Sequence, residues 1–202
     1  MNETQKKDMI NKTKEEISRF LDLFLKIEEY LEKKDRVIVG IDGNSASGKT
    51  TLANALKDIY GVDVIHMDDF FLPKDLRSEK RLNEIGGNIH YERFIDEIVN
   101  NMDQEKLEYR KFDCSKMDYI EDKITALTKP MLIIEGVYSL HPKYTQIYDL
   151  KVFLSSQDED QKSRILERSN HEKLDRYIKE WLPLEESYFK EFEINKTCDF
   201  IF

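Results

Sequence analysis

One glycine-rich segment constrains the fold of this chain more than any other part of its sequence. After a β-branched apolar run, the segment reads Gly43-Asn44-Ser45-Ala46-Ser47-Gly48-Lys49-Thr50. Two glycines separated by four residues and followed by Lys-Thr fit a loop whose backbone N–H groups converge on phosphate at the start of a helix. The residues from Thr51 onward are helix-forming. We therefore predict a strand, a phosphate-binding loop and a helix in that order.

The residue types in this loop indicate a nucleoside triphosphate as the ligand. Lys49 is expected to reach the β- and γ-phosphates, and the hydroxyl of Thr50 is expected to hold Mg²⁺. ATP and Mg²⁺ are thus the expected cofactors. The alternative interpretation is a flexible Gly/Ser loop that binds no ligand. The predicted nucleotide-binding residues are Gly43, Asn44, Ser45, Ala46, Ser47, Gly48, Lys49, Thr50 and Thr51.

Composition narrows the class of protein. A length of 202 residues predicts one domain, and a formal net charge of −9 argues against a general nucleic-acid binder, which would present a basic face. Cys114 and Cys198 stand alone, without metal-ligand spacing, so they indicate a reducing compartment. The charged N-terminus lacks the apolar core of a signal peptide, and the chain has no run long enough to span a membrane. We expect a cytoplasmic protein without membrane or nucleic-acid partners; a homo-oligomer remains open.

Alternation of apolar runs and helical segments predicts the architecture. Residues 8–34 have one apolar stripe at helical spacing, which indicates an amphipathic N-terminal extension packed on its own sheet or, alternatively, on a partner. Residues 72–90 are polar and contain Pro73, Gly86 and Gly87, so they predict a long surface excursion. Strands are expected at Val37–Ile41, Val62–His66, Met131–Glu135, Leu150–Leu154 and Asp199–Phe202, and helices at 49–60, 91–101, 158–169 and 174–192.

This order predicts an α/β, three-layer fold of the P-loop NTPase type. Near-continuous apolar strands indicate a mostly parallel five-stranded sheet with helices on both faces. Residues of about 155–190 would form a small lid and the helix that follows it. Because ligands of such sheets bind at the carboxyl ends of the strands, the residues that follow strand ends should gather with the loop.

Acidic residues lie at the ends of two predicted strands. Asp68 and Asp69 come after the second strand, where a carboxylate could accept the proton of an attacking hydroxyl; a turn or helix cap is the alternative. Asp68 is also a candidate metal ligand. Glu135 ends an apolar strand and is expected on the Mg²⁺ side of the site, unless it is simply a solvated strand-end acid.

Two further segments carry charged or aromatic groups. Arg164 and Arg168 are four residues apart on one helical face, so they could close over the γ-phosphate, or could form a solvated face paired with nearby acids. The segment Tyr109–Asp113 could stack on and bind a planar acceptor, or could be an ordinary strand.

Taken together, these motifs resemble the uridine kinase branch of the P-loop kinases, from about Arg36 to the C-terminus. The resemblance implies that Asp68 is the base for the acceptor hydroxyl, with Phe70 in register, that Glu135 is the metal-side carboxylate, and that Arg164 and Arg168 belong to the lid. It also implies an acceptor pocket lined by Tyr109, Phe112 and Asp113. His90 stands where the family has a ribose-binding Asp, so we expect uridine and cytidine to be poor substrates.

The sequence thus favours an ATP-dependent small-molecule kinase, whose acceptor is a hydroxyl of a nucleoside or a related metabolite. A nucleotide-dependent switch is the first alternative, although the chain lacks an obvious guanine-reading Asn-Lys-x-Asp segment. A non-catalytic binding module is the second.

Overall fold

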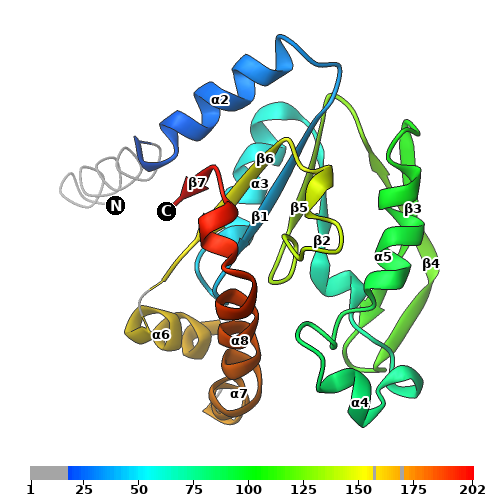
Figure 1. Ribbon diagram of the computed structural model, residues 1–202, viewed down its shortest axis with the longest axis vertical. Helices are drawn as coiled ribbons and strands as arrows, with labels where there is room; N and C mark the ends of the chain where they lie inside the picture. The colour runs from blue at the N-terminus through cyan, green and yellow to red at the C-terminus, as the bar shows by residue number, and fades with distance from the viewer. Residues whose placement is uncertain (1–17, 157, 169–170) are drawn as a thin grey trace, which may run out of the picture.

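The computed structural model describes residues 18–156, 158–168 and 171–202. At its centre lies a parallel sheet in the strand order β2-β5-β1-β6-β7 (Figure 1). All five predicted strands are confirmed; two have the predicted bounds, and the ends of the other three shift by one or two residues. Their bounds are β1 Val37–Gly43, β2 Asp63–His66, β5 Met131–Glu135, β6 Leu150–Leu154 and β7 Phe200–Ile201.

One face of the sheet is covered by two helices, α2 (Leu21–Leu31) and α3 (Lys49–Tyr60). Apolar side chains of both helices form one core cluster with alternate residues of β1, β5 and β6. Leu23 and Ile27 of α2 are fully buried in this cluster, whereas Leu25 on the opposite side of the helix is exposed. The apolar stripe of the N-terminal extension therefore packs on the chain's own sheet over α2, while residues 1–17 lie outside the described residues.

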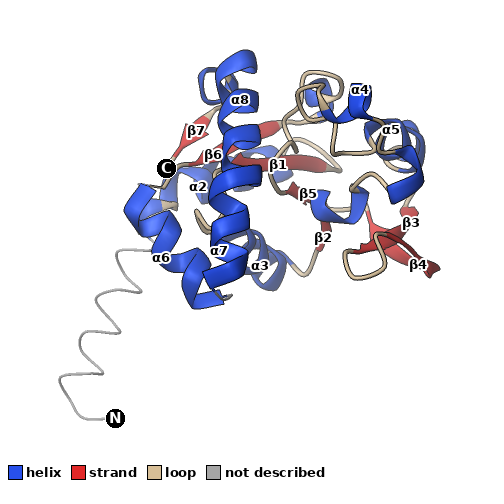
Figure 2. Ribbon diagram, turned by 90° about the horizontal axis from the view of Figure 1, so that it is seen from below, coloured by secondary structure: helices blue, strands red, loops and turns tan. Residues whose placement is uncertain are grey.

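The opposite face is covered by α5 (Tyr91–Glu97), α8 (Leu182–Phe192) and the segment that follows β5. Figure 2 shows α8 running past the sheet, with α7 directly before it. Tyr188 of α8 is fully buried in this second core cluster. The sheet is thus enclosed on both sides, as its apolar strands predict.

An antiparallel hairpin packs beside this second layer. It consists of β3 (Lys106–Asp113) and β4 (Asp118–Leu127), which pair with each other in a two-stranded sheet. Leu107, Tyr109 and Phe112 of β3 enter the second core cluster. The segment Tyr109–Asp113 is therefore part of a strand.

Short helices and turns complete the chain. The lid region contains two helices and a π-helical turn that leads into α8 without a break. These and the remaining elements are η1 Met67–Phe70, η2 Lys74–Leu76, α4 Glu79–Leu82, η3 Val99–Asn101, η4 Thr145–Ile147, α6 Asp158–Arg168, α7 His171–Arg176, η5 Tyr177–Trp181 and η6 Ile194–Thr197. Among the residues that the structure describes, no helix is long and apolar enough to cross a membrane.

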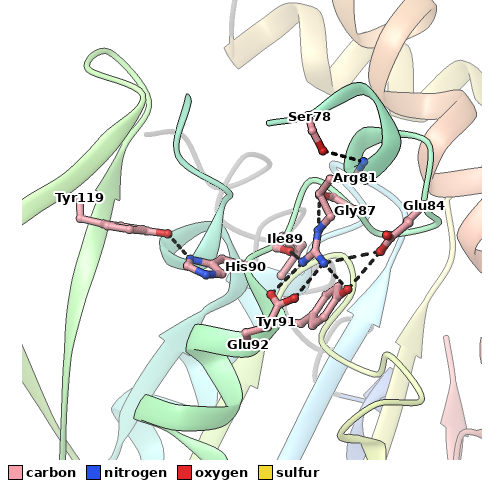
Figure 3. A network of polar contacts seen from close by, with 9 residues as sticks. All are labelled: Ser78, Arg81, Glu84, Gly87, Ile89, His90, Tyr91, Glu92 and Tyr119. Carbon is pink, nitrogen blue, oxygen red and sulfur yellow. Dashed lines mark hydrogen bonds and ion pairs between the residues drawn. The ribbon is translucent and has the colours of Figure 1, made fainter. Parts of the chain in front are cut away.

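Arg81 of α4 contacts several parts of the predicted surface excursion, residues 72–90 (Figure 3). Its guanidinium pairs with both carboxylate oxygens of Glu92 at 2.9 Å and lies 3.7 Å from the centre of the Tyr91 ring. It also donates to the backbone carbonyls of Gly87, at 3.2 Å, and Ile89, at 2.9 Å. These contacts fix the excursion against the start of α5, so the excursion has an ordered path despite its polar sequence.

Candidate active site

The phosphate loop connects β1 to α3 along a path that requires glycine at its first position. Gly43 has a φ of 138°, and a Cβ atom there would lie 2.0 Å from the backbone oxygen of Leu154 on the neighbouring strand. Gly48 is the N-cap residue of α3. The first backbone N–H groups of a helix have no intrahelical partner, so those of α3 are available to an anion at the loop.

Lys49 folds back over the loop. Its Nζ donates to the carbonyls of Gly43 at 2.8 Å and Asn44 at 2.7 Å. The neighbouring Thr50 donates from Oγ1 to Oε1 of Glu135 at 3.2 Å. The fold therefore brings together the loop and the strand-end acid of β5, as the sheet topology predicts.

His66 also lies beside Glu135 at this end of the sheet, and the sequence motifs do not single it out. It pairs in register with Glu135 across β2 and β5, and its Nδ1 lies 2.5 Å from Oε1 of Glu135. The hydrogen bond to this carboxylate raises the pKa of His66. The only signal in the sequence is a polar residue at a strand end, two positions before Asp68.

The two adjacent acids after β2 have different surroundings. Asp68 borders two cavities of the site, whereas Asp69 is buried, with its Oδ2 lacking a hydrogen-bond partner among the described residues. Asp68 remains exposed to the cavities, but the protein atoms around its carboxyl group displace part of its solvent shell, which raises the pKa of Asp68 to about 6. The negative charge of Glu135 acts in the same direction. A carboxylate with such a pKa is half-deprotonated at about pH 6 and largely deprotonated at pH 7, in the range where a general base works well.

The first cavity is bordered by the phosphate loop and has a volume of about 260 Å³. Its lining also includes Glu135, Gly136 and Val137 at the end of β5, and Ile165 and Tyr177 of the lid region. The lid also contacts the loop directly, because Nη1 of Arg164 donates to the carbonyl of Ala46 at 3.2 Å. Arg168 ends α6, and its side chain lies outside the described residues.

A second cavity, of about 550 Å³, adjoins the first. The two share four lining residues, which are Ser45, Asp68, Val137 and Tyr177. The remaining described lining residues of the second cavity are Phe71, Asn88, Cys114, Ser115, Tyr138, Arg176, Trp181 and Glu185. Asp68 thus lies where the phosphate-loop cavity meets a larger cavity with several aromatic walls.

The residues that the sequence assigns to the acceptor pocket lie around the second cavity and not in its described lining. Phe70 is fully buried and stacks on Tyr109 with ring centres 5.4 Å apart. Phe112 packs edge-on against Phe71, which does line the cavity. Asp113 accepts bonds from the backbone N–H and the hydroxyl of Ser115 in the hairpin turn.

His90 is also absent from the described lining of the second cavity. Figure 3 shows its ring directed at Tyr119, whose hydroxyl lies 2.6 Å from Nδ1 of His90. Burial lowers the pKa of His90, which favours the neutral imidazole. His90 is therefore a neutral ring that is bound to the hairpin.

Two buried acids complete the site, and neither is marked by a sequence motif. Asp42, the residue before Gly43, is fully buried; it accepts bonds from the N–H groups of Gly43 and Leu140 and from the hydroxyl of Tyr188. Burial raises the pKa of Asp42 to about 6. Glu185 of α8 accepts the backbone N–H of Ser45 at 2.9 Å and also the Ser45 hydroxyl.

The oxygen donors at the loop fit Mg²⁺. This ion prefers oxygen ligands and is usually held by one or two carboxylates, or a hydroxyl, together with nucleotide phosphates. Thr50 and Glu135 present such oxygens 3.2 Å apart beside the loop. In the described part of the chain, no group of three or more His, Cys, Asp or Glu side chains could hold a metal by itself. The residues therefore fit an ion held largely by the nucleotide.

Comparison with known proteins agrees with this architecture. No family model matches the chain. A curated uridine kinase from Bacillus thuringiensis (strain Al Hakam) is 30% identical over 142 residues, which is 65% of this chain and 65% of that protein. The chain thus matches just under two thirds of the length of that relative.

Solved structures extend the fold comparison. A structure described as a possible uridine kinase from Bacillus stearothermophilus superposes with a TM-score of 0.64 at 23% identity, covering 90% of this chain and 99% of that one. A D-glycerate 3-kinase from Cryptococcus neoformans gives a TM-score of 0.55 at 15% identity, covering 75% and 78%. The chain is a homologue of the curated uridine kinases and has the fold of the uridine kinase-like P-loop kinases.

Proposed function

We propose that this chain is an ATP-dependent kinase that transfers the γ-phosphoryl group to a hydroxyl of a small molecule. The observation that carries the proposal is the junction of two cavities at Asp68. One cavity is bordered by the phosphate loop and the other is large enough for a metabolite. Kinship with uridine kinases supports the same activity class.

The donor side of the proposed reaction uses the phosphate loop. The N–H groups at the start of α3 bind phosphate oxygens, and Lys49 exchanges its two backbone carbonyl partners for the β- and γ-phosphates. Mg²⁺, when bound, would neutralise charge on the phosphates. Thr50 and Glu135 are the residues that would hold it, with Asp68 close by. Arg164 and Arg168 of the lid would stabilise charge on the transferred group.

The acceptor side depends on Asp68. Its carboxylate orients the acceptor hydroxyl and accepts the proton as the oxygen attacks the γ-phosphorus. The raised pKa of Asp68, about 6, suits this role because the group is a stronger base than an ordinary Asp and remains largely deprotonated at pH 7.

Uridine and cytidine are expected to be poor acceptors. A neutral His90, bound to Tyr119, cannot supply the carboxylate that the family uses for ribose hydroxyls. Phe70, Tyr109, Phe112 and Asp113 would support the acceptor cavity from behind, through Phe71 and the hairpin turn.

The two free cysteines, Cys114 and Cys198, are consistent with a reducing cytoplasm, where we propose that the protein acts.

An acceptor screen tests the proposed function. Purified protein with Mg-ATP is incubated with a panel of hydroxylated metabolites, and ADP release is measured against Lys49→Ala as the blank. We expect acceptor-dependent ADP release that the blank lacks. A nucleotide-dependent switch would instead bind Mg-ATP normally while no acceptor in the panel accelerated ADP release.

A further inference from the structure

We propose that Glu185 selects the acceptor, and that the second cavity takes hydroxylated molecules that present a hydrogen-bond donor, such as an amine or a second hydroxyl, and carry no acidic group. This inference rests on the proposed function, since it assigns the acceptor class of the same site.

Glu185 is held in one orientation. It is only 4% exposed, and its two carboxylate oxygens accept the backbone N–H and the hydroxyl of Ser45 in the phosphate loop. A carboxylate offers about four acceptor sites, so two remain for other donors. Because Glu185 also lines the second cavity, a bound molecule can supply those donors. An acceptor that does so is fixed relative to the phosphate loop through a single side chain.

The charge of the cavity determines which molecules it accepts. Asp68 and Glu185 are the acids among its described lining residues, and Arg176 is the cation. Arg176 is exposed, and its guanidinium lies 3.3 Å from Glu180 one turn later, so its charge is partly balanced by that acid. The described lining therefore has one more acid than cation, and the buried charged group among them is the acid Glu185. An acidic acceptor would be placed against like charges, whereas an amine or hydroxyl would be attracted to them.

The aromatic lining residues of the second cavity restrict the rest of the acceptor molecule. Phe71 and Trp181 pack edge-on with ring centres 5.6 Å apart, and Tyr177 lies 6.0 Å from Trp181. Tyr138 adds a further ring beside the acids and has a φ of 75°, a conformation that is rare for a tyrosine. Aromatic faces attract planar rings and cationic groups. The walls and the charge thus favour the same class, a ring-containing alcohol that is neutral or basic. Ribonucleosides are the expected exception within this class, because the neutral His90 cannot supply a carboxylate for their ribose hydroxyls.

Binding of three matched probes tests the inference. The probes are para-substituted benzyl alcohols that carry an aminomethyl, a hydroxymethyl or a carboxylate group, and they are titrated calorimetrically into the protein with Mg-ADP. We expect the aminomethyl compound to bind most tightly and the carboxylate compound least tightly. In Glu185→Gln, affinity for the aminomethyl probe should fall by roughly 10- to 100-fold, the range for loss of a hydrogen bond to a charged group.

The matched control is Glu186→Gln, which removes the same charge from the adjacent, exposed position of α8. This substitution should leave the ranking of the three probes unchanged and should change each Kd by less than about twofold. A purely structural role of Glu185 would weaken all three probes equally in Glu185→Gln, and that result would overturn the inference. Tightest binding of the carboxylate probe, or no binding of any probe, would also overturn it.

The acceptor screen separates this inference from the proposed function. An acidic compound as the best acceptor would contradict the selection by Glu185 and leave the kinase activity standing. A neutral or basic donor-bearing compound as the best acceptor would support both.

Discussion

The hydroxyl of Tyr188 donates a 2.8 Å hydrogen bond to Oδ2 of Asp42, and both side chains are fully buried. Asp42 directly precedes the phosphate loop, and Tyr188 lies on the helix that follows the lid. This contact therefore joins the helix that carries Glu185 to the base of the nucleotide site.

Removal of that hydroxyl should destabilise the fold. Tyr188→Phe leaves a buried carboxylate without one of its donors, so the free energy of unfolding should fall by about 1–3 kcal/mol. Urea denaturation measures the change. Tyr30→Phe, on the partly exposed helix α2, is the control and should change the free energy by less than about 0.5 kcal/mol. Equal changes in the free energy of unfolding for the two substitutions would show that the hydrogen bond to Asp42 does not stabilise the fold.

Gly43→Ala should be far more damaging than a glycine substitution elsewhere. The new Cβ would lie 2.0 Å from the carbonyl oxygen of Leu154, so strand pairing and loop would both have to shift. We expect a loss of more than about 3 kcal/mol, measured by thermal or urea unfolding. Gly61→Ala is the matched control. It also has a positive φ, of 64°, but its Cβ would meet no atom within 4 Å, and we expect a cost of about 1 kcal/mol. Similar losses at both positions would contradict this account of the loop.

Lys49→Ala should weaken nucleotide binding. Loss of a charge-assisted contact to phosphate costs about 1.5–3 kcal/mol, so the Kd for Mg-ATP should rise by roughly 10- to 150-fold. Isothermal titration calorimetry measures the Kd. Lys57→Ala, at an exposed position on the same helix, should leave it unchanged. An unaltered Kd in Lys49→Ala would exclude the phosphate-loop interpretation.

The pH dependence of turnover should follow Asp68. Its pKa is raised to about 6, so the base form is lost as the pH falls through 6. We expect kcat/KM for the acceptor to be level above about pH 7 and to fall about tenfold per pH unit well below pH 6. A profile that stays flat down to pH 4.5 would contradict the assignment, because an unperturbed Asp titrates near 3.9.

The sequence predicts the parts of this protein that follow from local pattern. The phosphate loop, the five strands and α3 are recognisable because each combines apolar periodicity with specific turn residues. The β3–β4 hairpin is harder to predict because β4 is mostly exposed and has no apolar run. The acceptor cavity is harder still. Its acids and rings, such as Glu185 and Trp181, come from distant segments that only the packing of α8 brings beside Asp68.

The measurement that tests the central claim most directly compares Asp68→Asn with Asp69→Asn. With the best acceptor from the screen, Asp68→Asn should lower turnover by about 10²–10⁴-fold, the usual contribution of a positioned general base, while the Kd for Mg-ATP changes little. Asp69→Asn alters a buried acid that borders neither cavity among the described residues, so it should retain most of the turnover. A larger loss in Asp69→Asn, or full turnover in Asp68→Asn, would contradict the role of Asp68 as the base.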